Sequence, residues 1–164
     1  MELGNAGNVD AAKQLADLLE EKHLTVTTAE SCTGGLVSSR LVDVPGISQS
    51  LLQGLVTYSN EAKMRLLGVK EETLLAHGAV SEETAREMAL GGAAACGADL
   101  CLATTGIAGP GGGTPQKPVG LVYMACALKG EVTVERWQFS GDRRQVREQA
   151  AQKVLELAIR LLRA

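Results

Sequence analysis

The stretch "LTVTTAESCTGGLVSSRLV", residues 24–42, decides the fold class. Residues 24–30 form a short run of mostly β-branched side chains, which predicts a β-strand. Small and hydroxyl residues follow in "SCTGG", residues 31–35, and predict a turn. Residues 36–44, "LVSSRLVDV", then favour a short helix. A strand that passes through a tight turn into a helix is typical of α/β folds.

The rest of the chain continues this alternation. Lys129 and Gly130 separate two strand-like runs, which predicts a hairpin and therefore antiparallel strands in the sheet. Asp142 and Gln145 form a D-x-x-Q capping box that opens the last helix. The expected fold is a single α/β domain over residues 1–164, a three-layer α/β/α sandwich with a mixed β-sheet. The other expected helices lie at 9–23, 60–68, 70–78, 82–98 and 143–164, and the other expected strands at 51–59, 99–105, 119–128 and 131–139.

Composition indicates a core built from aliphatic side chains. The chain has 164 residues, enough to bury a core without disulfide bonds. Apolar residues make up 45% of it, yet it contains only one Phe, one Trp and two Tyr. Ala, Val, Leu and Ile must therefore fill the interior. Such a composition suits β-branched strands covered by Ala/Leu helices.

Charge and cysteine usage exclude several classes of protein. Sixteen basic and nineteen acidic side chains give a net charge of −3, which argues against extensive binding to the phosphate backbone of DNA or RNA. No run approaches the roughly 18 apolar residues of a membrane span, and the N-terminus does not resemble a signal peptide. Four cysteines without C-x-x-C spacing and only two histidines argue against a zinc cluster. We expect a cytoplasmic protein with reduced thiols and no metal or other cofactor.

The turn at residues 31–35 is the first candidate site. Exposed N–H groups at the start of a helix, together with the helix dipole, attract anions. Gly34 and Gly35 allow a ligand to approach the backbone closely. Cys32 near a helix N-terminus is a candidate nucleophile with a lowered pKa. A plain capped turn with a small buried cysteine is the structural alternative.

The second candidate is the glycine-rich loop "TTGIAGPGGGTPQKPVG", residues 104–120. It follows a predicted buried strand, and ligands of open α/β sheets bind outside the carboxyl ends of the strands. Its composition fits either a phosphate wrapped by backbone N–H groups or a flexible connection. Arg143, Arg144 and Arg147 lie in the first turns of the last helix. One of the three is expected to meet a phosphate, and the other two are expected to be solvated.

The third candidate is Lys63, in "TYSNEAKMRLLGV", residues 57–69. With Asn60 as the expected N-cap, Lys63 would stand at the third helical position, where the helix dipole disfavours a cation. The dipole and burial both favour the neutral amine, so Lys63 is a candidate general base. Neither His23 nor His77 stands in a stretch typical of a catalytic loop, which makes a Ser-His-Asp triad difficult to assemble.

A lysine base needs a nucleophile, and the residues alone leave several open. Ser48 and Ser50 lie in the loop before the second strand, and Ser31 lies in the first turn. A serine hydroxyl becomes nucleophilic when an adjacent base accepts its proton. Cys32 remains a further candidate.

Five longer motifs follow one another along the chain: "TAESCTGG", "GLVTYSNEAKMRLLGV", "HGAVSEETAREMA", "TGIAGPGGGTPQKPVG" and "FSGDRRQVREQA". Taken together, they resemble the CinA C-terminal domain family, whose characterised members are nicotinamide-nucleotide amidases. The similarity covers roughly residues 8–163. Many family members carry an additional N-terminal domain that resembles molybdopterin-binding proteins, so this chain is similar to the stand-alone form.

The resemblance implies hydrolysis of the carboxamide of nicotinamide mononucleotide to nicotinate mononucleotide and ammonia. It implies a serine/lysine dyad of Ser48 and Lys63, assisted by Tyr58, and no metal. Ser48 would attack the amide carbon, and Tyr58 would relay or hold the proton. The implied substrate-binding residues are Ser31, Cys32, Thr33, Gly34, Gly35, Thr105, Gly106, Ile107, Ala108, Gly109 and Arg147.

A nucleotide-binding module without catalysis is the alternative function, linked to competence or to the DNA-damage response. It would keep the glycine-rich turns but would need no neutral lysine. In either case the expected partner is a small-molecule nucleotide, without direct contact to nucleic acid or membrane. The helices, rich in Ala and Leu, are expected to pair in a homodimer.

Overall fold

The computed structural model describes residues 6–164, with side chains described from residue 11 onward, and it confirms the α/β prediction. Residues 1–5 of the expected domain lie outside the described part. No helix within residues 6–164 has the length and apolar character needed to cross a membrane. Along these residues the elements are α1 (Ala6–Lys22), β1 (Val26–Glu30), α2 (Leu36–Val42), the 3-10 helix η1 (Ile47–Gln49), β2 (Leu51–Val56), α3 (Asn60–Leu67), α4 (Glu71–His77), α5 (Glu82–Cys96), β3 (Leu100–Gly106), β4 (Leu121–Leu128), β5 (Glu131–Gln138) and α6 (Arg143–Arg163).

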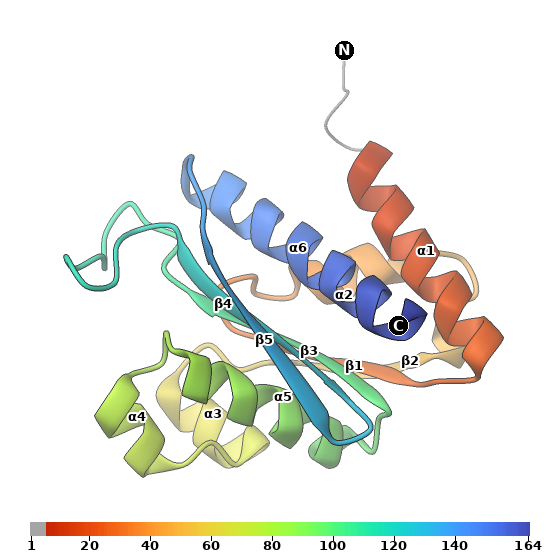
Figure 1. Ribbon diagram of the computed structural model, residues 1–164, viewed down its shortest axis with the longest axis horizontal. Coiled ribbons are helices and arrows are strands. Elements are labelled where there is room, and N and C mark those ends of the chain that lie inside the picture. The colour runs from red at the N-terminus through yellow and green to blue at the C-terminus, as the bar shows by residue number, and fades with distance from the viewer. Residues whose placement is uncertain (1–5) are drawn as a thin grey trace.

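The strands form one open sheet in the order β2-β1-β3-β4-β5 (Figure 1). The strands β2, β1 and β3 are mutually parallel, whereas β4 is antiparallel to both β3 and β5. The predicted mixed sheet is therefore confirmed. Lys129 and Gly130 make the β4–β5 turn, and both have positive φ values, of 50° and 88°. This matches the backbone that two-residue hairpin loops require.

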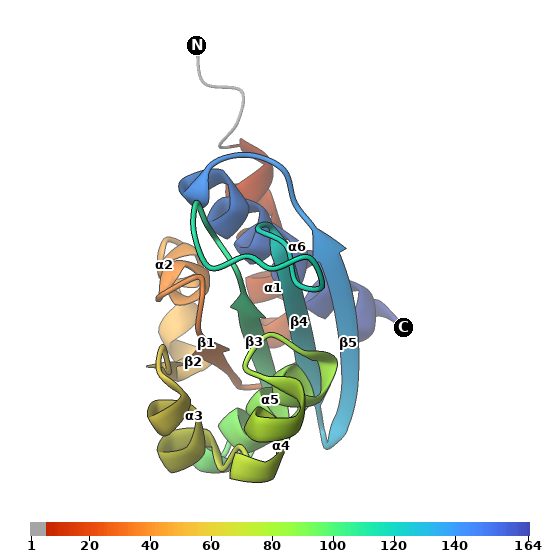
Figure 2. The ribbon, with the colours of Figure 1, turned by 90° about the vertical axis from the view of Figure 1, so that its left-hand side faces the viewer.

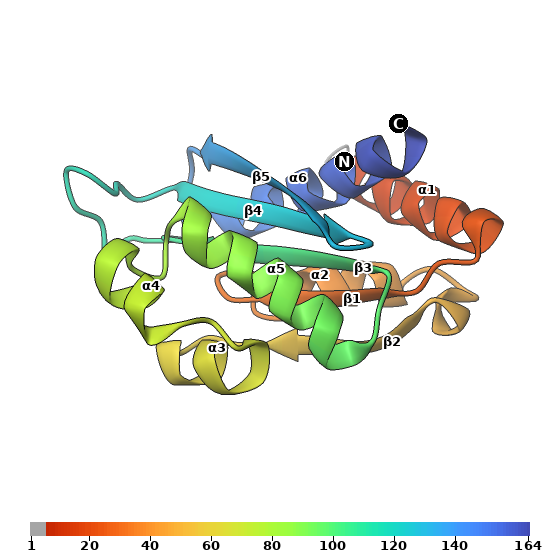
Figure 3. The ribbon, with the colours of Figure 1, turned by 60° about the horizontal axis from the view of Figure 1, so that its bottom comes forward.

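Helices cover both faces of the sheet and complete the three-layer sandwich (Figures 1 and 3). On one face α1, α2 and α6 enclose a large aliphatic core that includes Leu15, Val26 and Leu155. On the other face α5 packs across the sheet through Met88 and small side chains such as Ala85. α3 lies against α5 so closely that Gly91 faces the carbonyl of Leu67, where any side chain would clash. This packing fixes α3, the helix that carries Lys63.

Local signals at the helix ends agree with the sequence in all but one case. Asp142 and Gln145 form the predicted capping box of α6, and Ser81 caps α5. The prediction of Asn60 as the N-cap of α3 is wrong, because the side chain of Ser59 accepts the N–H of Ala62. Asn60 is instead the first helical residue. Lys63 consequently occupies the fourth helical position.

The order of the strands creates a crevice at one end of the sheet. From β1 the chain passes through α2 to β2 at the sheet edge, and then returns through α3, α4 and α5 on the other face to β3. β1 and β3 are neighbours whose connections leave in opposite directions, which is the arrangement that opens a binding crevice at the carboxyl ends of strands. The turn after β1 and the glycine-rich loop after β3 flank this point (Figure 2). The sequence after β2, which carries Tyr58 and Lys63, reaches the same end of the sheet.

Candidate active site

A cavity of about 270 Å³ lies at the carboxyl ends of β1, β2 and β3. Its lining combines two cationic side chains, one hydroxyl group next to a buried amine, and a short apolar wall. No Asp or Glu is among the described residues that line it, so its charge is positive. The lining residues are Ser31, Cys32, Tyr58, Asn60, Lys63, Ala79, Val80, Thr105, Gly106, Ile107, Ala108, Gly109, Gly111, Gly112 and Arg143.

Lys63 is almost fully buried, with 1% of its surface exposed. Helical side chains point toward the helix N-terminus, so the Lys63 side chain runs back along the first turn of α3 toward the end of β2. There its Nζ donates hydrogen bonds to the hydroxyl of Ser31 at 2.9 Å, to the carbonyl of Thr57 at 2.9 Å and to the carbonyl of Tyr58 at 3.2 Å. No carboxylate pairs with it among the described residues. It is a buried amine held by three neutral acceptors.

Burial lowers the pKa of Lys63 to about 8, although charge on the Cys32 sulfur acts in the opposite direction. At pH 7 about one molecule in ten then carries a neutral amine. A neutral amine has two hydrogens and one lone pair. The carbonyls of Thr57 and Tyr58 accept the two hydrogens, which leaves the lone pair directed at the Ser31 hydroxyl. The geometry therefore allows Lys63 to accept a proton from Ser31.

Ser31 is the first residue after β1 and is held from both sides. Its N–H donates to the carbonyl of Thr104 in β3 at 3.0 Å, and its own carbonyl accepts the N–H of Gly34 at 3.1 Å. The preceding Glu30 is fully buried and accepts hydrogen bonds from backbone N–H groups of the following turn and helix, at Gly35, Val37 and Ser38. The strand–turn–helix unit that decides the fold class thus also fixes the position of the candidate nucleophile.

Cys32 lines the cavity but is poorly suited to be the nucleophile. Burial raises the pKa of its thiol to about 11, and a hydrogen bond with Thr104 offsets only part of that effect. Almost none of it is thiolate at neutral pH, and the thiolate is the reactive form. The candidate nucleophile is therefore Ser31.

Ser48 is not brought to Lys63, which corrects the expected Ser48/Lys63 dyad. Ser48 is exposed and lies in η1, before the first residue of β2, whereas Lys63 contacts the backbone just after the last residue of β2. Six residues of extended strand separate the two ends by roughly 20 Å. Ser50, the other serine of that loop, is buried at the same distant end.

Tyr58 lies at the rim of the cavity rather than between the hydroxyl and the amine. Its side chain is 63% exposed, and its hydroxyl accepts a hydrogen bond from Arg143 at 3.0 Å. Only its backbone carbonyl contacts Lys63 among the described hydrogen bonds. The expected proton relay through the Tyr58 hydroxyl therefore lacks the contact it needs. Arg143 also donates to the carbonyl of Gly109 at 2.7 Å, so it bridges two walls of the cavity.

Arg147, expected to bind substrate, is not among the described lining residues. Its guanidinium donates to the carbonyls of Cys32 at 3.1 Å and Thr33 at 2.8 Å. It thus contacts the backbone of the turn at residues 31–35, while Arg143, one helical turn earlier, lines the cavity. Thr33, Gly34 and Gly35 are likewise absent from the described lining. Thr33 is fully buried and bonds to Glu30 and Thr104 through its hydroxyl.

The end of β3 and the loop after it contribute all five of their expected residues, Thr105 to Gly109. Asn60, Ala79, Val80, Gly111 and Gly112 also line the cavity, although they were not among the expected site residues. Ala79 and Val80 immediately precede α5, and the carbonyl of Ala79 accepts the hydroxyl of Thr105 at 2.7 Å. The Ser81 N-cap marks a helix start that packs beside β3. The Ser81 cap is therefore the sequence signal that points to the two residues before it.

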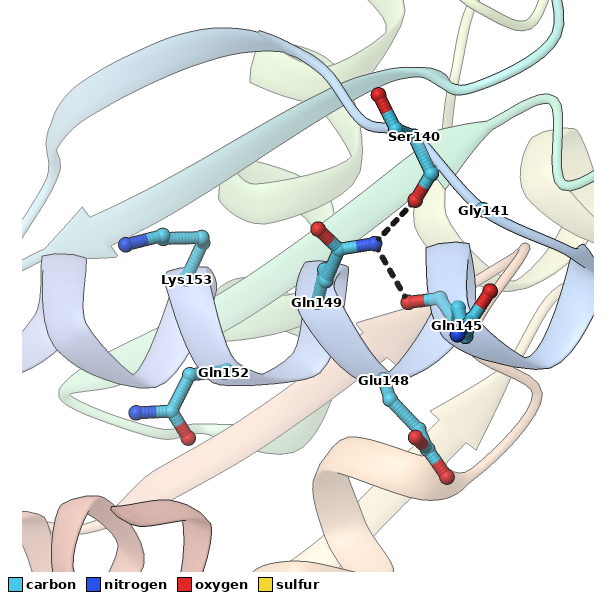
Figure 4. Close-up of a pocket in the computed structure, with 7 residues that line it drawn as sticks. All are labelled: Ser140, Gly141, Gln145, Glu148, Gln149, Gln152 and Lys153. Carbon is cyan, nitrogen blue, oxygen red and sulfur yellow. Dashed lines mark hydrogen bonds between the residues drawn. The ribbon is translucent and has the colours of Figure 1, made fainter. Parts of the chain in front are cut away.

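A larger hollow of about 560 Å³ lies along the outer side of α6 and is lined by polar side chains and by Ser140 and Gly141 (Figure 4). There Gln149 donates to the carbonyls of Ser140 at 2.8 Å and Gln145 at 3.0 Å. No buried charge or paired base and hydroxyl lies among its lining residues, so the smaller cavity is the better candidate for chemistry. Within the described residues, no three His, Cys, Asp or Glu side chains lie close enough to hold a metal ion.

Known proteins share both the sequence and the fold. A CinA-like protein of Kosmotoga olearia is 53% identical over 148 residues, which are 90% of this chain and 36% of that protein. A Clostridioides difficile protein, named as competence-damage inducible, is 56% identical over 148 residues, 90% of this chain and 35% of its own length. The chain thus spans about a third of the length of these relatives.

Solved structures agree over nearly the whole chain. The competence/damage inducible protein CihA of Agrobacterium tumefaciens superposes with a TM-score of 0.94 at 38% identity, and the match covers all of both chains. A competence or damage-inducible protein of Enterobacter asburiae gives a TM-score of 0.91 at 40% identity, covering 94% of this chain and 98% of that one. The family model of the CinA C-terminal domain matches residues 8–162. The chain therefore belongs to the CinA C-terminal domain family.

Proposed function

We propose that this protein hydrolyses the carboxamide of nicotinamide mononucleotide to nicotinate mononucleotide and ammonia, with Ser31 as nucleophile and Lys63 as base. The observation that carries the proposal is the 2.9 Å contact between the buried Lys63 amine and the Ser31 hydroxyl. A buried lysine without an anionic partner destabilises a fold, so its presence calls for a function. Deprotonation of a serine is such a function.

The reaction needs two proton transfers in each half. The neutral Lys63 amine takes the proton of Ser31 as the Ser31 oxygen attacks the amide carbon. The resulting ammonium then gives this proton to the amide nitrogen, the C–N bond breaks, and ammonia leaves. The acid is now bound to Ser31 as an ester. Lys63 next takes a proton from water, which attacks the ester, and returns it to the Ser31 oxygen as the acid is released.

Each tetrahedral intermediate carries an oxyanion that requires hydrogen-bond donors. The N–H groups of Cys32 and Thr33 follow Ser31 directly, and neither donates to a carbonyl among the described backbone hydrogen bonds. The Cys32 N–H contacts its own thiol sulfur. Donors on the same turn as the nucleophile reach the oxygen that develops next to it. These two N–H groups are the proposed oxyanion site.

The composition of the cavity supports a pyridine nucleotide as the substrate. Val80, Ile107 and Ala108 provide an apolar wall for a flat ring. The Arg143 guanidinium lies on the glycine-rich side of the cavity and suits a phosphate, which it would bind together with backbone N–H groups. Since no carboxylate lines the described cavity, an anionic substrate meets no repulsion. Arg143 takes the role that was expected of Arg147.

Ammonia release from nicotinamide mononucleotide tests this function. The wild type should release ammonia, whereas Ser31→Ala and Lys63→Ala should lower kcat by about 10⁴-fold, as the loss of one member of a catalytic unit does. Ser48→Ala is the matched control and should stay close to wild type. Both inactive variants should still be stabilised thermally by nicotinate mononucleotide. A folded wild type that binds the nucleotide but releases no ammonia would leave the non-catalytic binding module as the function.

A further inference from the structure

Arg147 is a half-buried cation that contacts no carboxylate among the described side chains. It forms no ion pair among the described residues, and both of its hydrogen bonds go to backbone carbonyls, those of Cys32 and Thr33. These two carbonyls belong to the turn that carries Ser31, and they lie 115 and 114 residues before Arg147 in the chain. A guanidinium fork that fits two successive carbonyls sets the orientation of two peptide planes at once.

The direction of the carbonyls sets the direction of the N–H groups. In a trans peptide the C=O and N–H point in opposite directions, and the only cis bond in the described chain is Gly109–Pro110. The Cys32 carbonyl points at Arg147, so the N–H of Thr33 points away from it. The Thr33 carbonyl also points at Arg147. The N–H of Gly34, at the other side of the same peptide, accordingly points away from Arg147 and donates to the carbonyl of Ser31. Arg147 therefore sets the direction of the Thr33 N–H directly. It sets the direction of the Cys32 N–H only through the Thr33–Gly34 peptide, because the Gly34 N–H holds the Ser31 carbonyl.

We propose that Arg147 is a positioning residue for the reaction: it holds the turn at residues 31–35 so that the N–H groups of Cys32 and Thr33 meet the oxyanion. The inference rests on the proposed amidase function. Arg147 touches neither the substrate nor the reacting atoms and acts through the backbone. Its positive charge at the carbonyl end also polarises the Cys32–Thr33 peptide, which strengthens the N–H at the other end as a donor.

The three arginines near the N-terminus of α6 make different contacts, so their variants can distinguish a substrate contact from a positioning role. Arg143 faces the cavity, Arg147 contacts the turn, and Arg144 is exposed and pairs with Glu148 at 2.8 Å. Loss of a substrate contact raises KM, whereas loss of an interaction made only in the transition state lowers kcat. Arg144 is the matched control, because it has the same side chain on the same helix.

Steady-state kinetics on Arg147→Ala and Arg144→Ala provide the test. Arg147→Ala should lower kcat by about tenfold to a hundredfold and leave KM within about twofold, because the N–H donors are displaced but the substrate contacts remain. Guanidinium ion at low millimolar concentration should restore part of the lost kcat, which mere loss of packing would not allow. Arg144→Ala should match wild type and show no response to guanidinium.

Two results overturn the proposal while the amidase function stands: an unchanged kcat in Arg147→Ala, or a raised KM with normal kcat, which would make Arg147 a substrate contact. If Arg147→Ala does not fold, Arg147→Lys is measured instead, and a lowered kcat with a nearly unchanged KM again supports the proposal. If the wild type releases no ammonia, the proposed function fails instead. Amide hydrogen exchange then tests the clamp itself, since Arg147→Ala should speed exchange in residues 31–35 at least about tenfold, and Arg144→Ala should not.

Discussion

The Nζ of Lys63 lies 2.9 Å from the Oγ of Ser31, although 32 residues separate them in the chain. Ser31 directly follows β1, whereas Lys63 comes from α3 and reaches the end of the adjacent parallel strand β2; both side chains are more than nine-tenths buried. Lys63 thus loses hydration and gains no counter-ion from the described part of the chain. The contact therefore has a cost in stability, and that cost can be measured.

Replacing Lys63 with methionine should stabilise the protein at neutral pH. Burial holds the pKa of Lys63 at about 8 in the folded protein, below its ordinary value of 10.5. The unfolded chain therefore binds more protons between these values, so the wild-type free energy of unfolding should rise with pH through this window. From pH 7 to pH 9.5 this group contributes a rise of about 2 kcal/mol.

Urea unfolding of both proteins at pH 7 and pH 9.5 measures this effect. The rise with pH should be about 2 kcal/mol smaller in Lys63→Met than in wild type. Lys70→Met, at an exposed position just after α3, is the control and should keep the wild-type dependence. If the free energy of unfolding depends equally on pH in wild type and Lys63→Met, the pKa of Lys63 is not lowered in the folded protein.

The rate of ammonia release should follow the neutral fraction of Lys63. Because burial brings its pKa to about 8, kcat/KM should rise about tenfold from pH 6 to pH 7 and level off above pH 9. Cys32→Ala should keep this profile, since a thiol with a pKa of about 11 is not the group that titrates. A profile already flat at pH 6 would exclude Lys63 as the base.

Arg143→Met should weaken recognition of the phosphate. The guanidinium faces the cavity and is held by the carbonyl of Gly109 and the hydroxyl of Tyr58. Hydrogen bonds to a charged group contribute about 1.5–3 kcal/mol, so KM for the mononucleotide should rise roughly tenfold to a hundredfold. Nicotinamide riboside, which lacks the phosphate, serves as the comparison substrate. Its kcat/KM should not change in Arg143→Met, and an equal loss for both substrates would count against a phosphate contact.

Glu30→Gln should destabilise the fold. The buried Glu30 carboxylate accepts hydrogen bonds from Thr33, Gly35, Val37 and Ser38. Glutamine has nearly the same shape but replaces one acceptor oxygen with a donor group, which would face N–H or O–H donors. We expect a loss of about 2–3 kcal/mol in urea unfolding, without a change in the m-value. Glu61→Gln, at an exposed position in the first turn of α3, should change stability by less than about 0.5 kcal/mol.

Most of the fold was predictable because its signals are local. Alternation of β-branched runs with helical runs, the Asp142–Gln145 capping box and the Lys129–Gly130 turn each depend on a few neighbouring residues. The error at α3 was also local. Ser59 and Asn60 are both favourable N-cap residues, and composition alone does not decide between them.

The site was only partly predictable because it depends on which strands become neighbours. Lys63 and the glycine-rich loop stand out by residue type and position. Ser48 is closer to Lys63 in sequence than Ser31, yet parallel pairing of β1 with β2 places residue 31 beside residue 57 and leaves Ser48 at the far end. Arg143 and Arg147 share one face of α6, and which of them reaches the cavity depends on where the helix crosses the sheet.

The clamp formed by α6 has a consequence for biosynthesis. Ser31, Lys63 and the glycine-rich loop all precede α6 along the chain, so a ribosome makes the hydroxyl, the amine and the loop first. Arg143 and Arg147 emerge later, and they tie the loop and the turn together from the last helix. A nascent chain in which α6 has not yet emerged from the ribosome therefore contains Ser31 and Lys63 but lacks the contacts of Arg143 and Arg147. Activity should therefore reach its full level only after α6 has been made and has docked onto the sheet.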